Sequence, residues 1–200
     1  GVCVIPNALP KEFTNRLHPD TEAAFGRQTV LMLSSLKEYK GTREFIELAN
    51  RLPQYKFVLV INDVQENIDS FLYKYNIFCS QNLIIYPRQN NVVPFYNEAS
   101  IVINLTDKKL AVETFGLTAL EAMSAGLPVI VPTEGGIAEM VTDGENGYKI
   151  DVQDLNKIVE YVHLLLSDQE LYNKLSNNAS AYSRNFNIDK MTESILSLFD

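Results

Sequence analysis

Short apolar runs rich in valine and isoleucine, separated by stretches with helical spacing, constrain the fold of this 200-residue chain most strongly. Strands that are apolar from end to end are typical of a parallel sheet buried on both faces, with helices as the crossover connections. We expect strands at residues 29–34, 56–61, 83–86, 101–105, 129–131 and 148–150. We expect helices at residues 42–52, 67–75, 91–98, 115–126, 135–141, 154–166, 169–185 and 189–199. This pattern predicts a doubly wound α/β fold of about six strands, with helices on both faces and a helical C-terminus.

Local signals mark several ends of these elements. Thr42 is a plausible N-cap residue, Gly126 suits a helix C-terminus, and Pro128 blocks further helix. Residues 11–27 form a long polar stretch, which we expect to be irregular and to precede the first strand of the sheet.

Composition excludes several classes of protein. The formal charge of −8, from 17 basic and 25 acidic residues, has the wrong sign for a broad nucleic-acid-binding face. Cys3 and Cys79 lie far apart and form no metal-binding or redox motif, which favours a reducing compartment. We predict neither a membrane span nor a secretion leader, and one domain with at most an appendage.

The predicted topology places a ligand site at one edge of the sheet. In doubly wound folds, ligands bind beyond the carboxyl ends of the strands where the strand order reverses, here between strands 29–34 and 101–105. We therefore expect the loops 34–41 and 106–116 to meet there.

The residues of the second loop indicate what the site binds. The chain reads ETFGLTALEAMSAGLPVI from Glu113, and the amides of residues 115–118 at the helix start form an anion site that Gly116 leaves open. Carboxylates at Glu113 and Glu121 prefer hydroxyl partners on either side of the anion. Lys40 in the first loop is the candidate counter-charge, with Ser34 and Ser35 beside it. Together these groups predict a site for a diphosphate flanked by two sugars, as in a nucleotide sugar.

Other interpretations apply to the same residues. Two glutamates eight positions apart are no evidence by themselves, and Lys40 and Arg88 could be ordinary surface side chains. Gly135 and Gly136 could form a tight turn or allow a ligand to approach the backbone.

The sequence from Glu113 to Ile130, together with the glycines that follow it, resembles the group 1 (family 4) glycosyltransferases. The resemblance also includes SLKEYKG after the first strand and VIPNA near the N-terminus. The matching positions are Glu113, Phe115, Gly116, Leu117, Glu121, Ala122, Met123, Gly126, Pro128, Val129, Gly135, Gly136, Glu139 and Gly147.

The resemblance implies one half of a GT-B fold, namely the Rossmann-like, donor-binding C-terminal domain. Residues 29–200 would form this nucleotide-sugar-binding domain, residues 1–28 would be an interdomain segment or linker remnant, and the N-terminal acceptor domain would be absent. The implied activity is hexosyltransferase transfer with retention, from a UDP-, GDP- or ADP-sugar to a glycan or lipid-linked acceptor. It would require neither a cofactor nor a protein-bound metal, and the fragment alone would be inactive.

The resemblance also assigns roles to residues. Glu113 would contact the donor sugar as the catalytic-site residue, Glu121 the ribose, and Tyr86 to Arg88 would lie near the base. The diphosphate would bind Lys40 and the amides of Phe115, Gly116, Leu117 and Thr118, with Ser35 beside it.

One departure from the family pattern concerns the first loop. Many members have Gly and Arg where this chain has Ser34 and Ser35, so phosphate binding would depend on Lys40 and the helix start alone, or on Arg88 by a different route.

The resemblance further implies a cytoplasmic protein of surface polysaccharide biosynthesis, with peripheral association at the inner face of the membrane. A GT-B nucleotide-sugar epimerase and a non-catalytic nucleotide-sugar-binding module are the alternatives.

Overall fold

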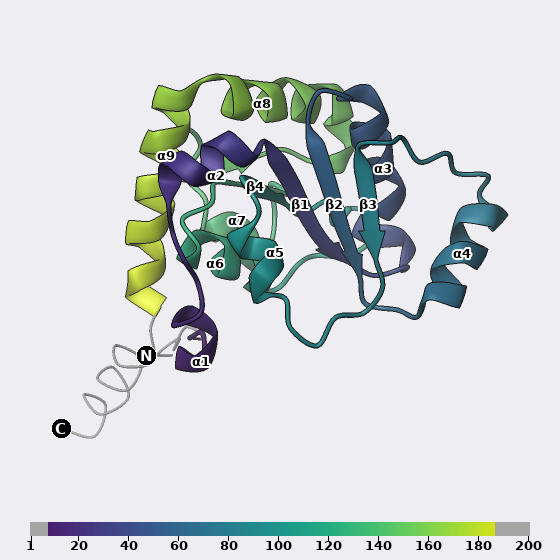
Figure 1. The fold of residues 1–200 in the computed structure, drawn as a ribbon, viewed down its shortest axis with the longest axis horizontal. Coiled ribbons are helices and arrows are strands. Elements are labelled where there is room, and N and C mark those ends of the chain that lie inside the picture. The colour runs from purple at the N-terminus through teal and green to yellow at the C-terminus, as the bar shows by residue number, and fades with distance from the viewer. Residues whose placement is uncertain (1–7, 187–200) are drawn as a thin grey trace.

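The computed structural model describes residues 8–186, which form a six-stranded parallel sheet in the order β3-β2-β1-β4-β5-β6 (Figure 1). The strands are β1 (Thr29–Ser34), β2 (Lys56–Ile61), β3 (Leu83–Tyr86), β4 (Ile101–Ile103), β5 (Val129–Val131) and β6 (Gly147–Lys149). β1 pairs with β2 from Thr29 opposite Lys56, and with β4 from Val30 opposite Ile101. The strand order therefore reverses between β1 and β4, as the sequence predicts.

Helices cover both faces of the sheet, with α3 behind the strands and α5 in front of them in Figure 1. The helices that follow β1 to β5 are α3 (Thr42–Arg51), α4 (Gln65–Lys74), α5 (Val93–Asn97), α6 (Leu117–Ser124) and α7 (Gly136–Glu139). Two longer helices, α8 (Leu155–Ser167) and α9 (Gln169–Ser183), complete the C-terminal part, and short 3₁₀ turns are η1 (Glu38–Lys40), η2 (Val152–Asp154) and η3 (Arg184–Phe186). No helix within residues 8–186 is long and apolar enough to cross a membrane.

The central strands are buried over most of their length, which explains their apolar composition. Val30, Leu31, Ile101 and Ile130 are each at most 1% exposed and belong to one continuous core. The doubly wound α/β fold is thus confirmed.

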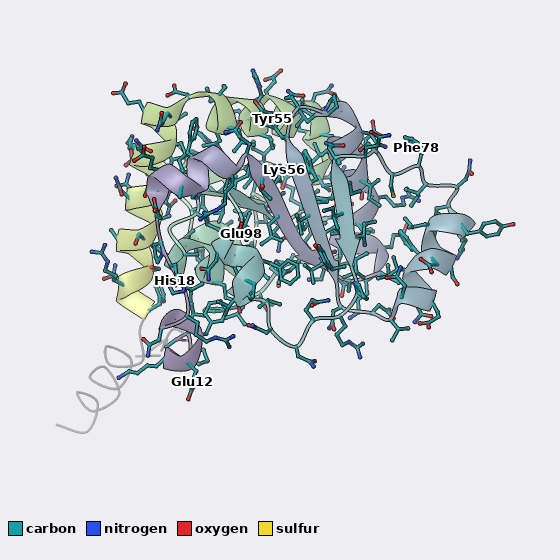
Figure 2. All side chains as sticks on the ribbon, viewed as in Figure 1. Glu12, His18, Tyr55, Lys56, Phe78 and Glu98 are labelled. Carbon is teal, nitrogen blue, oxygen red and sulfur yellow. The ribbon has the colours of Figure 1, made fainter. Side chains whose placement is uncertain are left out.

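We expected the stretch 11–27 to be irregular, but this is wrong. It contains α1 (Lys11–Thr14) and α2 (Thr21–Arg27). The Asp20 side chain accepts a hydrogen bond from the Ala23 amide (3.0 Å) and caps α2, a signal that sequence reasoning missed. His18, labelled in Figure 2, lies between these helices, and its backbone amide donates to the Asn97 side chain (2.9 Å). The segment therefore packs on the same body as the sheet, and the division at residue 28 stays a prediction.

Several element boundaries differ from expectation by one to three residues. β4 ends at Ile103 rather than 105 because the Asn104 side chain accepts from the Thr106 amide (2.9 Å), which turns the chain. Gly126, in the left-handed region (φ 73°), ends α6 as predicted, with the amide of Leu127 donating to the Ala122 carbonyl (3.0 Å). The expected helix 189–199 and the predicted interdomain residues 1–7 lie outside the described residues.

Candidate functional site

The loop after β1 and the loop after β4 meet at the carboxyl edge of the sheet. The amide of Asp107 donates to the carbonyl of Tyr39 (2.8 Å). Gly41 has φ 71°, and a Cβ there would overlap the side chain and carbonyl oxygen of Leu105. Glycine at this position therefore permits the close approach that the switch-point argument predicts.

A cavity of about 170 Å³ lies between these two loops. It is lined by Met32, Leu33, Ser34, Ser35, Lys40, Asn104, Leu105, Thr106, Glu113, Leu117 and Thr118. Five of the predicted site residues thus gather at one cavity, namely Ser35, Lys40, Glu113, Leu117 and Thr118. The remaining five, Tyr86, Arg88, Phe115, Gly116 and Glu121, do not line it.

Lys40 and Glu113 form an ion pair in this cavity. The Lys40 Nζ atom lies 2.9 Å from Glu113 Oε2, and the two side chains are 28% and 22% exposed. The Thr106 hydroxyl donates to the same carboxylate oxygen (3.2 Å). Burial raises the pKa of Glu113, but the Lys40 and Thr106 hydrogen bonds outweigh it and hold the pKa below the ordinary value. The carboxylate is therefore ionised and held in place by a cation and a hydroxyl.

A hydroxyl network shapes the first loop. We expected Thr42 to be the N-cap of α3, but it is not. Its hydroxyl instead donates to the Ser35 carbonyl (2.9 Å) and lies 3.0 Å from the Ser34 hydroxyl. Gly41 occupies the N-cap position instead. Sequence reasoning missed Thr42 and Thr106 as supports of the site, since neither role is visible without the tertiary structure.

The N-terminus of α6 faces the cavity. The helix begins at Leu117, so the amides of Leu117 and Thr118 precede the first intrahelical donors and belong to the positive end of the helix. Gly116 is the N-cap residue with φ 67°, and a Cβ there would overlap the Ile137 side chain. Of residues 115–118, which we expect to form an anion site, Leu117 and Thr118 line the cavity.

Gly135 and Gly136 contact the protein's own backbone. A Cβ at Gly135 would overlap the carbonyl oxygen of Glu113, and one at Gly136 would overlap that of Thr114. Of the two interpretations that the sequence left open, close packing in a turn therefore accounts for both glycines. Their function is to support the loop that carries Glu113.

An ion-pair cluster also anchors the loop after β4, through Lys108. Lys108 lies 2.8 Å from an Asp151 carboxylate oxygen and 3.0 Å from one of Glu134, and the Thr133 hydroxyl also bonds to Asp151 (2.7 Å). The pKa of Asp151 is lowered, because hydrogen bonds from Lys108 and Thr133 outweigh the opposing effect of burial. The loops after β4, β5 and β6 are thereby joined at one edge of the sheet.

Glu121 lies one turn further along α6 than Leu117 and outside the cavity. Its Oε2 atom accepts a hydrogen bond of 2.5 Å from the Tyr96 hydroxyl. Burial raises the pKa of Glu121, and the Tyr96 hydrogen bond opposes that rise.

Tyr86 and Arg88 lie at and just beyond the end of β3. The Tyr86 ring packs edge to face on Phe95 (5.0 Å between centroids), and the Arg88 Nε donates to the Asn62 side chain (2.8 Å). The structure does not bring Arg88 to the cavity, so it gives no support to the alternative phosphate route through this residue.

Acid is expected to destabilise the protein through Glu113. A carboxyl group whose pKa is lower in the folded state stabilises the fold above its unfolded value, and this contribution is lost as pH falls through the folded pKa. The loss should therefore set in below about pH 4.5, the ordinary value. Urea denaturation of the wild type and Glu113→Gln from pH 7 downward measures it. The wild type should lose the larger share of its unfolding free energy, and equal losses in both proteins would contradict the assignment.

The described residues do not meet the requirements of a metal site. Within the described residues, no group of three or more His, Cys, Asp or Glu side chains is placed to hold a metal ion. The expectation that the reaction proceeds without a protein-bound metal remains a prediction.

Comparison with known proteins gives consistent matches. The family model "Glycosyl transferases group 1" matches residues 14–182. An uncharacterised glycosyltransferase of Haemophilus influenzae is 28% identical over 186 residues, which is 90% of this chain and 51% of that protein. The chain thus spans about half the length of that relative.

Solved structures show the same fold. Sucrose-phosphate synthase from Thermosynechococcus elongatus superimposes with a TM-score of 0.79 at 21% identity, over 98% of this chain and 51% of that one. Anabaena HepE, solved in complex with UDP and glucose, gives 0.73 at 18% identity, over 96% and 52%. With the family model extending over most of the described residues, the chain belongs to the group 1 glycosyltransferases.

Proposed function

We propose that this chain is the donor-binding domain of a retaining glycosyltransferase that takes its sugar from a nucleoside diphosphate. The observation that carries the proposal is the Lys40–Glu113 pair in a cavity at the N-terminus of α6. A cation and a helix start suit a diphosphate, and a fixed carboxylate suits the hydroxyls of a sugar. Family membership and the likeness to HepE, itself solved with UDP and glucose, support the same assignment.

The proposed chemistry assigns a task to each group at the cavity. The bond between the anomeric carbon of the sugar and the phosphate oxygen of the donor breaks, and its electron pair stays on that oxygen. The acceptor hydroxyl oxygen bonds to the same carbon, and the hydroxyl proton passes to the departing diphosphate. Lys40 and the amides of Leu117 and Thr118 stabilise the negative charge on the departing diphosphate. Glu113 accepts hydrogen bonds from the sugar and holds it in place, and we do not assign it as a nucleophile. Glu121 binds the ribose, with Tyr86 and Arg88 towards the base.

The rest of the proposal concerns the whole protein. A glycan or lipid-linked acceptor would bind a second, N-terminal domain, and the product would enter a surface polysaccharide or glycoconjugate. The enzyme would work in the cytoplasm at the inner face of the membrane. The donor would be a UDP-, GDP- or ADP-sugar.

Calorimetric titration with UDP, GDP, ADP and their sugar conjugates tests the donor site. We expect binding selective for one base, and Lys40→Met should weaken it about 10- to 100-fold because a hydrogen-bonded charge is lost. Lys37→Met is the matched control, since Lys37 lies in the same loop but is exposed and does not line the cavity. Its affinity should stay within about twofold of the wild type.

Two results would contradict the proposal. Absence of binding to every nucleotide would remove the donor site, and equal effects of both lysine substitutions would remove the role of Lys40. Nucleotide-sugar binding by a whole protein that transfers no sugar would favour the non-catalytic module, and interconversion of the bound sugar would favour the epimerase.

A further inference from the structure

Tyr96 and Glu121, 25 residues apart in the sequence, meet one turn along α6 from Leu117, which lines the cavity. The Tyr96 hydroxyl donates to Glu121 Oε2 at 2.5 Å, within the range of a charge-assisted hydrogen bond. Among residues 8–186, no other group donates a hydrogen bond to the Glu121 carboxylate. Neither the family motif nor the proposed roles include Tyr96.

The Tyr96 ring is held rigidly. The residue lies in α5 and is 0% exposed, and the ring of Phe13 packs on it edge to face with 5.9 Å between centroids. The backbone on both sides is hydrogen-bonded, since the Tyr96 amide donates to Val92 and its carbonyl accepts from Ala99. A buried ring in this setting fixes its hydroxyl at one point.

Glu121 depends on that hydroxyl for its charged state and orientation. Its side chain is half-buried, and burial raises its pKa while the Tyr96 hydrogen bond lowers it. The hydrogen bond thus favours the ionised carboxylate and fixes one of its oxygens. Within residues 8–186, no donor contacts the other oxygen, which can accept from a ligand.

We propose that Tyr96 is a positioning residue that holds the Glu121 carboxylate so that its second oxygen accepts a hydrogen bond from the ribose of the donor nucleotide. This inference rests on the proposed function, in which Glu121 binds the ribose. It makes Tyr96 a determinant of the preference for ribonucleotides over 2′-deoxyribonucleotides, although Tyr96 itself does not touch the ligand.

The test compares the affinity for the preferred nucleoside diphosphate with that for its 2′-deoxy analogue. The wild type should bind the ribonucleotide about tenfold more tightly, the equivalent of one good hydrogen bond. Tyr96→Phe keeps the ring and its packing but removes the hydroxyl, and should reduce this ratio to about threefold or less. In a Glu121→Gln background, Tyr96→Phe should change the ratio no further.

Tyr172→Phe is the matched control. Tyr172 is also 0% exposed, and its hydroxyl donates to the buried carbonyl of Ser100 (2.7 Å), away from Glu121. This variant should lower the thermal midpoint about as much as Tyr96→Phe does, and leave the ribose preference intact.

Each outcome is decisive. An unchanged ribose preference in Tyr96→Phe overturns the inference and leaves the proposed function standing. A wild type that binds both analogues equally overturns the inference and the ribose role of Glu121, but leaves the donor site at Lys40 and Glu113 standing. A chain that binds no nucleotide overturns the proposed function and the inference with it. Loss of the preference in Tyr96→Phe but not in Tyr172→Phe supports the inference.

Discussion

Replacing Glu113 by glutamine is expected to reduce sugar transfer by the whole protein about 100- to 1000-fold. The carboxylate is held in place by Lys40 (2.9 Å) and Thr106 (3.2 Å), so in the proposed function it would meet the sugar without reorganising. Interactions of this kind contribute most in the transition state, where one misplaced hydrogen-bond partner costs this much in rate. The measurement is the transfer rate at saturating donor, together with the affinity for the nucleoside diphosphate.

The affinity should change in the opposite direction. Glu113→Gln removes the negative charge next to the Lys40 ammonium, so the unglycosylated diphosphate should bind more tightly than in the wild type. The nucleotide sugar should no longer bind more tightly than the nucleoside diphosphate, because the hydrogen bonds between Glu113 and the sugar are lost. This combination separates a role in positioning the sugar from simple damage to the site.

Glu134→Gln is the control for this prediction. Glu134 also pairs with a lysine, Lys108 at 3.0 Å, on a neighbouring loop, but it is 60% exposed and does not line the cavity. Transfer should remain within about twofold of the wild type. Full transfer by Glu113→Gln, or an equal loss in Glu134→Gln, would show that Glu113 has no special role.

Gly136→Ala is expected to lower the free energy of unfolding by about 3 kcal/mol. The new Cβ would overlap the Thr114 carbonyl oxygen and lie 2.9 Å from the Thr114 carbonyl carbon and 3.4 Å from the Phe115 Cα. These neighbours are backbone atoms, which cannot rotate away as a side chain can. Urea denaturation measures the loss, and nucleotide binding should weaken as well because the same loop carries Glu113.

Gly26→Ala provides the matched comparison. Gly26 lies in α2, and nothing lies within 4 Å of a Cβ placed there. The substitution should raise the free energy of unfolding by about 0.5–1 kcal/mol, because alanine loses less backbone entropy in a helix than glycine. Equal stability of Gly136→Ala and the wild type would mean that the loop moves aside freely, and would refute the support role of Gly136.

The alternation of apolar strands with helical stretches was sufficient to predict the doubly wound sheet. The reason is that burial of a parallel strand on both faces leaves a continuous apolar run, such as that of β1. Ends set by local backbone chemistry were also predictable, as Gly126 shows. The helices within 11–27 were missed because their burial depends on contacts with distant residues, such as the ring of Phe25 on Tyr172.

The sequence by itself determined the fold and the two loops that meet at the carboxyl edge of the sheet. These features follow from local periodicity and from the handedness of βαβ crossovers, which hold for any chain of this pattern. The tertiary structure decided which side chains touch: the Lys40–Glu113 pair spans 73 residues, and Tyr96 reaches Glu121 across 25. It also decided that Gly136 packs against the backbone of the loop that carries Glu113. Such contacts depend on how separate elements pack, which no spacing within one element encodes.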